Sequence, residues 1–533
     1  MKDKYRIGVI CDLHLTEGNR TAQHAFLRCA AQRMRQEGAD AVICPGDVTA
    51  CGELEGYEAY REILRDFSLC EAAGNSDVRD PASAETMVQL FQNRELILGK
   101  RKVIGVNTPY GRIADGEKER LRNVKPGDLV FLHHDPESLE EESRNDLTAL
   151  AEQVPITILH GHAHQWMDRR IGNSRVIGVK CLDPDKCIGS FPALTWLTVS
   201  EEEIDLRECQ IGVPRETMED VRRYFGISCV DNQADVAYAL EHGIPNIELR
   251  CIDDWTPDWT ILPLIEEWRK QTKGYLSVHM PDIRIRDGEV VGKEQWYQAL
   301  EYACLVNADG LTMHPPRVKK SGIPYGGARW NEILTLYFDV VRKVRPGVKL
   351  GIENLHMNPG EAADGNRGFG YIPEEVSLWI NELNRMAGES NRVGHVLDVG
   401  HARNNGLLAQ KYPVSRWYER MGQKTVAYHI HQVVPFEDGY KNHCAIEEWF
   451  GPMINYTSFF WCWQQRILNH VPVFLEVKGH ENFEISVQAF ERLLVRKDEE
   501  VCLVPESNGS EPGAERGENM PGAERGERVP GAE

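Results

Sequence analysis

Three histidines lie within five positions in the segment ITILHGHAHQW, which covers residues 156–166. The apolar β-forming residues from Ile156 to Leu159 predict a strand that ends where the histidines begin. Two imidazoles spaced as His162 and His164 can reach one point in space, and neutral imidazole is the commonest metal ligand. Such a tract can also be a solvated loop, so metal binding requires partners from elsewhere in the chain.

Further residues of metal-binding type follow the other predicted strands of the same region. Each lies where a strand gives way to a loop, and such strand ends can converge on one edge of a sheet. The residues are Asp12, His14, Asp47, Asn75 and His133. Any one of them alone is a weak signal, but together and in this order they predict a shared metal site.

This order of motifs, Asp-x-His, Gly-Asp, Gly-Asn, His and Gly-His-x-His, resembles the calcineurin-like metallophosphoesterase family over roughly residues 5–207. The resemblance implies two divalent ions (Mn, Fe or Zn) that share Asp47, bind a phosphoryl group from both sides and activate a water. It places one ion on Asp12, His14, Asp47 and His164, and the other on Asp47, Asn75, His133 and His162. It also implies catalytic roles for Asp47, Asn75 and His133.

One position departs from the family pattern. The family usually reads Gly-Asn-His-Asp, and its histidine helps the leaving group depart, but here Ser76 takes that place. A serine hydroxyl cannot act as an acid near neutral pH, so we expect poor leaving groups to react slowly. We interpret His134 and His160 as structural residues or as residues that orient the ligands.

A second set of candidates follows a second alternation of strands and helices. Eight predicted strands in about 280 residues are typical of a TIM barrel, whose catalytic residues lie at the carboxyl ends of the strands. Ionisable residues in core strands are costly unless they are paired or bind a metal. Here they are His279, His314, Glu353, Asp398, His401, His429 and Glu476, with His443 in a loop after the seventh strand.

This half resembles the xylose-isomerase-like barrels over roughly residues 212–495, and more closely their endonuclease-four branch, which holds three zinc ions. Lys441 stands where that branch has an aspartate ligand, and Asp438 is further off. The resemblance therefore implies one or two zinc or manganese ions in the barrel rather than three. We interpret His431 as a residue that supports the ligands.

Without a third ion, the resemblance still leaves the single-metal site of the sugar isomerases and epimerases, with Glu353 and Glu476 as catalytic residues. That site consists of Glu353, Asp398, His429 and Glu476. His279 and His314 would then form a second ligand pair or contact the substrate. Isomerase and phosphodiesterase chemistry both stay open for the barrel.

The composition limits the partners of this chain of 533 residues. A net charge of −21 argues against a broad nucleic-acid-binding surface, so a small phosphorylated or sugar substrate is favoured while nucleic acid stays possible. The fourteen cysteines form no CxxC pair, which is typical of reduced cytosolic proteins. We expect a cytoplasmic protein without a signal peptide or membrane span, and the sequence does not predict the oligomeric state.

The predicted fold is α/β, with a four-layer α/β/β/α domain at residues 1–207, a (β/α)8 barrel at 212–497 and a disordered tail of PGAERGE repeats at 505–533. The first domain is expected to close with an antiparallel pair formed by residues 174–182 and 193–206. The leading hypothesis is a metal-dependent hydrolase of phosphate esters whose barrel holds a second site. The fusion alone suggests the further hypothesis that both sites act in sequence on one compound, which the sequence does not decide. The alternatives are a sugar isomerase or epimerase with an accessory phosphatase domain, and an enzyme in which one domain is a degenerate binding module.

Overall fold

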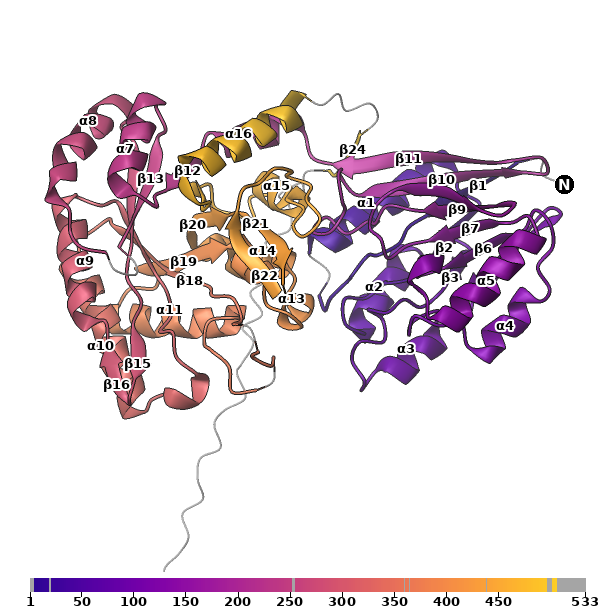
Figure 1. The fold of residues 1–533 in the computed structure, drawn as a ribbon, viewed down its shortest axis with the longest axis horizontal. Helices are drawn as coiled ribbons and strands as arrows, with labels where there is room; N and C mark the ends of the chain where they lie inside the picture. Colours follow the sequence, from indigo (N-terminus) through magenta and orange to yellow (C-terminus); the bar gives the residue numbers. More distant parts are fainter. Residues whose placement is uncertain are drawn as a thin grey trace, which may run out of the picture.

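The computed structural model describes residues 4–18, 21–251, 255–358, 360–363, 365–437, 439–495 and 501–505. Almost all of the predicted repeat tail, and also Asp438, lie outside these residues. The N-terminal domain is built on two sheets, and a closed barrel lies beside it (Figure 1). Among the residues described, no helix combines the length and the apolar character needed to cross a membrane.

The first sheet of the N-terminal domain has the strand order β24–β11–β10–β1–β2–β3. Its strands are β1 (Lys4–Val9), β2 (Ala41–Cys44), β3 (Leu69–Glu71), β10 (Ala193–Ser200), β11 (Ile204–Gly212) and β24 (Val501–Leu503). The apolar outer face of this sheet packs on helix α1 (Ala22–Glu37), which buries Phe26, Leu27 and Met34. The nearby helices are α2 (Leu54–Ile63) and α3 (Ala84–Leu90).

The second sheet has the order β4–β5–β6–β7–β9–β8. Its strands are β4 (Glu95–Leu98), β5 (Arg101–Val106), β6 (Leu129–Leu132), β7 (Thr157–His160), β8 (Met167–Ile171) and β9 (Ser174–Gly178). Alternate residues of the two sheets, such as Val9 and Phe131, pack together between them. Helices α4 (Asp115–Leu121) and α5 (Glu141–Gln153) cover the other face of the second sheet. This arrangement confirms the predicted four layers.

The expected closing pair is wrong. The strand within residues 174–182 is β9, which pairs with β7 and β8 in the second sheet. Residues 193–206 contain β10 and the start of β11, which pair with each other in the first sheet. Both segments read as strands, but nothing in their local pattern tells which sheet each one joins, because that depends on long-range packing.

The barrel consists of eight parallel strands in the order β12–β13–β14–β17–β18–β19–β20–β23, which confirms the prediction. They are β12 (Phe225–Ser228), β13 (Asn246–Arg250), β14 (Tyr275–His279), β17 (Gly310–Met313), β18 (Lys349–Glu353), β19 (Val393–Asp398), β20 (Thr425–Ile430) and β23 (Val473–Leu475). β12 pairs with β23 and so closes the ring.

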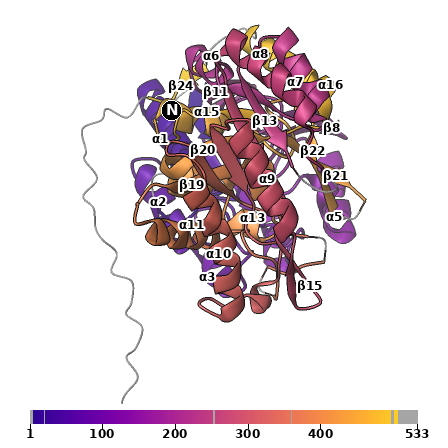
Figure 2. The same ribbon diagram turned by 90° about the vertical axis from the view of Figure 1, so that its left-hand side faces the viewer.

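Helices surround the barrel, and Figure 2, which is turned by 90° from Figure 1, shows α9, α10 and α11 in front. The larger ones are α6 (Arg215–Arg222), α7 (Asn232–Glu241), α8 (Leu262–Thr272), α9 (Lys293–Leu305), α10 (Ala328–Lys343), α11 (Pro373–Ala387), α14 (Val414–Met421), α15 (Thr457–Gln464) and α16 (Gly479–Val495). Shorter elements lie at the strand ends: α12 (Val399–Arg403), α13 (Leu408–Lys411) and the hairpins β15 (Arg284–Arg286) with β16 (Glu289–Val291) and β21 (Gln432–Phe436) with β22 (Gly439–Cys444).

The two domains share a buried contact. Asn455 of the barrel donates to the main-chain oxygens of Cys187 (2.6 Å) and Ser190 (2.9 Å), and Phe191 packs on Phe450 with ring centroids 4.7 Å apart. β24 follows the barrel in sequence, beyond residue 497, and pairs with β11 of the first sheet. The chain therefore returns to its N-terminal domain after completing the barrel (Figure 1).

Two candidate metal centres

Backbone strain is concentrated at the predicted ligands. Six of the eleven non-glycine residues with positive φ in the described part of the chain are predicted metal ligands. They are Asp12, His14, Asp47, His162, His164 and His443. Left-handed φ is unfavourable for such residues, and it is retained mainly where function requires the geometry. Main-chain bonds hold two of these loops together, because the N–H groups of Leu13 (2.7 Å) and His14 (3.1 Å) both donate to the Asp47 carbonyl.

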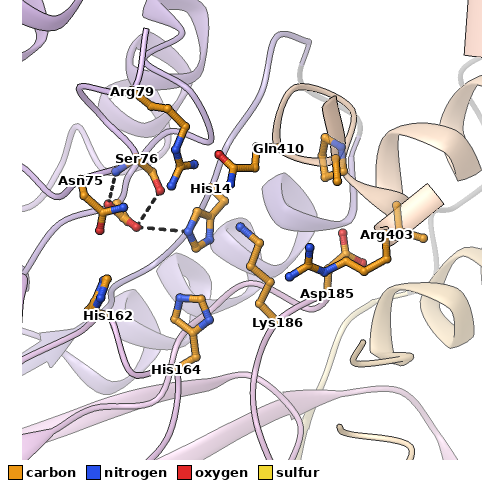
Figure 3. A pocket seen from close by; sticks show the side chains of 14 residues that line it. His14, Asn75, Ser76, Arg79, His162, His164, Asp185, Lys186, Arg403 and Gln410 are labelled. Atoms are coloured by element: carbon orange, nitrogen blue, oxygen red, sulfur yellow. Dashed lines mark hydrogen bonds and ion pairs between the residues drawn. The ribbon is translucent and has the colours of Figure 1, made fainter. Parts of the chain in front are cut away.

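Asp47 lies at the centre of the N-terminal cluster. Its Oδ2 is 3.3 Å from Nε2 of His14 and its Oδ1 is 3.4 Å from Nε2 of His133. Ser76 donates its hydroxyl to Oδ2 (2.8 Å) and its main-chain N–H to Oδ1 (2.7 Å); Figure 3 shows Ser76 and His14 reaching the same carboxylate. Burial opposes ionisation, but His133 and His14 hold the pKa of Asp47 well below its usual value. An ionised carboxylate between two imidazoles can bridge two ions.

The other predicted ligands gather on either side of Asp47. Nε2 of His133 is 2.9 Å from Oδ1 of Asn75 and 3.2 Å from Nδ1 of His162. On the opposite side, Oδ1 of Asp12 is 3.4 Å from Nε2 of His164, and Asp12, His14 and His164 each offer a ligand atom within 4.8 Å of the others. The structure thus brings together both sets of residues that the resemblance implied.

Asp183 is a functional candidate that the sequence reasoning missed. Its buried Oδ2 lies 3.0 Å from Nδ1 of His14, so it can fix the ring with Nε2 facing Asp47. The segment CLDPD around it carries no motif that could have found it. His134 and His160, for which a structural or a ligand-orienting role is predicted, have partners of their own: His134 contacts Thr108 (3.2 Å), and His160 lies 3.0 Å from the Gly161 carbonyl.

In the barrel, Glu353 at the end of β18 joins two groups of ligands. Its Oε2 is 3.2 Å from Nε2 of His279 and 3.4 Å from Nε2 of His314. Its Oε1 is 3.4 Å from Nδ1 of His429, which lies 3.1 Å from Oε2 of Glu476. The first group is His279, His314 and Glu353, and the second is Glu353, Asp398, His429 and Glu476.

Several buried atoms of this cluster make no hydrogen bond to any other described residue, although they face one another. They are Oε1 of Glu353, Oδ2 of Asp398, Nδ1 of His429, Nε2 of His431 and Oε2 of Glu476. Buried polar atoms without hydrogen bonds are costly. Divalent cations would satisfy them, one held by Glu353, Asp398, His429 and Glu476 and another by the group that contains His431. The residues present therefore fit the ions that the resemblance implies.

A third group contains His431, which we had interpreted as a supporting residue. Asp398, His401, His431 and His443 can each place a ligand atom within 4.8 Å of the others. Nδ1 of His431 lies 3.1 Å from the Gln432 carbonyl, and donation there leaves Nε2 available to a metal. The main-chain N–H of His443 also points at this Nδ1 (3.0 Å), which favours the tautomer whose proton is on Nε2. Binding a metal through Nε2 requires the tautomer whose proton is on Nδ1.

His443 lies on strand β22 rather than in a loop, which corrects the prediction. Lys441 lies on the same strand, where it pairs with Val434 and is exposed to solvent. The third group can therefore form without a carboxylate at residue 441. The hairpin itself has a sequence signal, because Asp438-Gly439 follows the mostly apolar segment QVVPF. No local pattern shows that this hairpin brings His443 to the other barrel ligands.

Other charged residues that support the barrel cluster were also missed. Glu248 of β13 is 2.7 Å from Nε2 of His429 and accepts hydrogen bonds from Ser277 (3.0 Å) and Thr312 (2.6 Å). Asp282 is 2.6 Å from Nδ1 of His314. Arg250 is 3.1 Å from Oε1 of Glu476. Each is a single residue whose partner lies far away in sequence, so no local pattern reveals it.

The fold and the clusters define a protein of two α/β domains, each with its own candidate metal centre. Residues 5–181 match the model of the calcineurin-like phosphoesterase superfamily domain, so this part of the chain is a calcineurin-like phosphoesterase domain. The barrel fused to it has the closed eight-stranded architecture that the sequence predicted. No curated protein matches the chain.

Solved structures resemble each half of the chain only distantly. A D-tagatose 3-epimerase-like protein is 18% identical, with 51% of this chain and 98% of the other covered and a TM-score of 0.36. Endonuclease IV from Thermus thermophilus is 14% identical, with coverages of 51% and 98% and a TM-score of 0.33. A predicted phosphoesterase from Streptococcus pneumoniae is 13% identical, with coverages of 39% and 91% and a TM-score of 0.22.

Proposed function

We propose that the N-terminal centre is a two-metal site that hydrolyses phosphate esters. The observation that carries this proposal is the position of Asp47, whose two oxygens face His14 on one side and His133 on the other. A carboxylate in that position can be shared by two ions, with Asp12, His14 and His164 on one side and Asn75, His133 and His162 on the other. Manganese, iron or zinc would suit these nitrogen and oxygen ligands.

Two bound divalent ions would stabilise the negative charge that develops on the phosphoryl group and supply an activated water. The chain itself holds the ligands in place. Ser76 fixes Asp47 through its hydroxyl and its main-chain N–H, and Asp183 orients His14. Because the Ser76 hydroxyl is a poor acid and is bound to Asp47, we propose a preference for esters whose leaving group needs no proton.

For the barrel we propose a second metal-dependent site that acts on phosphoester bonds, with zinc or manganese as the ion. Support comes from Glu353, which belongs to two of the ligand groups and so can be shared by two ions, while His431 can complete a third group. Two ions held by a shared carboxylate suit in-line displacement at phosphorus. Glu353 and Glu476 are the proposed catalytic residues.

A sugar isomerase or epimerase is the second candidate for the barrel. It is favoured by the compact group of Glu353, Asp398, His429 and Glu476, which can hold one ion and whose two glutamates can also move protons. In this case the N-terminal domain would be an accessory phosphatase. A degenerate binding module is disfavoured, because both centres retain their buried, clustered ligands.

The substrate that we propose is a small phosphorylated or sugar compound rather than nucleic acid. The chain carries a net charge of −21, which would repel the phosphate backbone of a long nucleic acid. A cavity of about 540 Å³ at the barrel mouth contains Arg250, Trp255, His443 and Lys478, which suits one ring with an anionic group. The proposed compartment is the reducing cytoplasm, since all fourteen cysteines are free thiols.

A substrate panel on the metal-free and metal-loaded protein tests both sites. It should contain aryl phosphomonoesters and diesters, cyclic nucleotides, abasic DNA and sugar phosphates, with manganese and with zinc. Asp12→Asn should remove the activity of the N-terminal site only, and Glu353→Gln that of the barrel only. The exposed Glu389→Gln is the matched control. Phosphoester hydrolysis that survives both substitutions would refute the assignment.

A further inference from the structure

The N-terminal centre opens into a cavity of about 170 Å³ that lies between the two domains. His14, Asp47 and Asn75 line one side, and residues of the barrel segment 403–414 line the other. Figure 3 shows Arg403 and Gln410 of that segment across the cavity from the centre. The barrel therefore supplies part of the pocket of the phosphoesterase domain.

Three cationic side chains line this cavity in a chain that is otherwise strongly acidic. They are Arg79 and Lys186 of the N-terminal domain and Arg403 of the barrel. Arg79 donates to the Ala50 carbonyl and Arg403 donates Nε to the Met453 carbonyl, each at 2.8 Å. Within the described ranges, neither guanidinium has a carboxylate at ion-pair distance. Two partly buried guanidinium groups without a carboxylate partner indicate an anionic ligand.

Two carboxylates close to Lys186 and Arg403, those of Asp183 and Asp185, have other partners. Nζ of Lys186 lies 3.8 Å from Oδ2 of Asp183, the atom that faces His14. Asp185 also lines the cavity, but it accepts hydrogen bonds from Gln23 (2.9 Å), from the main-chain N–H of Ser415 (3.2 Å) and from the hydroxyl of Ser458. Asp183 and Asp185 therefore act on Arg403 only from beyond ion-pair distance, and their contacts with other groups leave its guanidinium donors free to bind an anion.

The amide of Gln410 is a further unsatisfied group beside Arg403. Its buried Oε1 makes no hydrogen bond to any described residue, and the side chain lines the same cavity. An amide at this point can donate to an anion or accept from a hydroxyl next to it. The barrel side of the cavity therefore offers one guanidinium and one amide, facing the ammonium of Lys186.

We propose that Arg403, Gln410 and Lys186 form an anion subsite for the phosphoesterase centre, and that the substrate is a small phosphate ester with a second anionic group. This proposal rests on the proposed function, since the centre has to bind the phosphoryl group that is cleaved. The second group is a further phosphoryl group or a carboxylate, both of which match the planar donors of a guanidinium.

The test compares phenyl phosphate with 4-carboxyphenyl phosphate and 1,4-phenylene bisphosphate, on the full chain loaded with manganese. We expect kcat/KM to be at least about tenfold higher for one of the doubly anionic esters than for phenyl phosphate. The identity of the preferred ester shows whether the second anionic group is a carboxylate or a phosphoryl group. Arg403→Gln should reduce that ratio about tenfold, as expected for the loss of a charge-assisted hydrogen bond. Wild-type protein that hydrolyses all three esters equally well would overturn the subsite.

Arg416→Gln is the matched control. Arg416 of the barrel also joins the domains, through the Glu17 carbonyl (2.8 Å), and pairs with Glu419 of its own helix (3.0 Å). It lines a different cavity. Arg416→Gln should leave the ratio of kcat/KM between the doubly anionic ester and phenyl phosphate unchanged. An equal fall of this ratio in both variants would mean that domain packing, and not the subsite, sets the preference for the second anionic group.

Calorimetric binding of 4-phosphonobenzoate and phenylphosphonate, which are not hydrolysed, separates the two proposals. Tighter binding of 4-phosphonobenzoate that is lost in Arg403→Gln supports the subsite even if no ester is turned over, a result that would refute only the proposed hydrolysis. Equal binding of both phosphonates, together with no preference for the bisphosphate, would refute the subsite alone.

Discussion

His401 and Arg403 are two residues apart on the short helix α12, yet they belong to different sites. His401 joins Asp398, His431 and His443 in the third barrel group, whereas Arg403 lines the cavity of the phosphoesterase centre. Asp398 caps this helix by accepting from the His401 main-chain N–H (2.6 Å). One helix turn therefore connects the two candidate metal centres.

This connection predicts that losing a barrel ligand on α12 disturbs the other site. We expect His401→Ala to raise KM for a doubly anionic phosphate ester severalfold, because α12 holds Arg403 in place. His279→Ala removes a ligand on β14, away from α12, and should leave that KM unchanged. Steady-state kinetics of both variants measure the difference; equal effects on KM would contradict a role for α12.

Ser76 predicts the choice of leaving group. Its hydroxyl is bound to Oδ2 of Asp47, so it gives no proton to the departing oxygen. Aryl phosphates should therefore react much faster than alkyl phosphates, and Ser76→His should narrow the gap by raising the alkyl rate. Rates on a series of esters with increasing leaving-group pKa test this. A wild-type rate independent of leaving-group pKa would remove the basis of the prediction.

The two centres could be predicted in large part because ligands at strand ends leave short local motifs. Asp12 with His14 and His162 with His164 are close in sequence, and their order along the chain indicates one sheet edge. The barrel strands could be predicted because they are short apolar runs that alternate with helical segments, and strands three to eight carry an ionisable residue at or near their ends. In both domains the signal is local, while the convergence in space follows from the strand order.

The rest depends on contacts that no local pattern contains. Glu248 and Asp183 are single acids whose partners lie far along the chain, at His429 and His14. β24 is three residues long and joins a sheet that begins nearly five hundred residues earlier. The contribution of Arg403 to the phosphoesterase cavity requires the relative placement of the two domains, which sequence periodicity does not encode.

Metal content should respond unequally to loss of the barrel ligands. Glu353 belongs to two ligand groups and His443 to one, so Glu353→Gln should lose more zinc than His443→Ala. His431→Asn should lose about one equivalent if the third group is filled. Elemental analysis of the dialysed full-length protein measures this. Equal losses from Glu353→Gln and His443→Ala would contradict the shared role of Glu353.

His395 predicts sensitivity to acid. It is fully buried and stacks on Trp417 with centroids 5.8 Å apart, and neither ring nitrogen bonds to any residue that the structure describes. Burial lowers its pKa to about 3. Because the unfolded chain takes up this proton below about pH 6.5 and the folded chain does not, stability falls as the pH falls from about 6.5 toward 3.

His395→Phe should remove this effect while keeping the ring against Trp417. Between pH 7 and pH 5, the loss of unfolding free energy should be about 2 kcal/mol smaller than in the wild type. Denaturant unfolding of the chelator-treated proteins at both pH values measures this difference in unfolding free energy without a contribution from metal release. The same loss in both proteins would show that His395 is protonated in the folded state.

The most direct test of a metal-dependent phosphoesterase centre is the effect of Asp47→Asn on turnover. We predict that manganese restores hydrolysis of 4-nitrophenyl phosphate or its diester to metal-free wild-type protein. Asp47→Asn should lower kcat/KM by at least about a hundredfold, because an amide cannot bridge two ions. Its melting temperature should stay close to that of the exposed control Asp66→Asn, which keeps full activity. Near-wild-type turnover by folded Asp47→Asn protein, on every ester that the parent cleaves, would contradict the account.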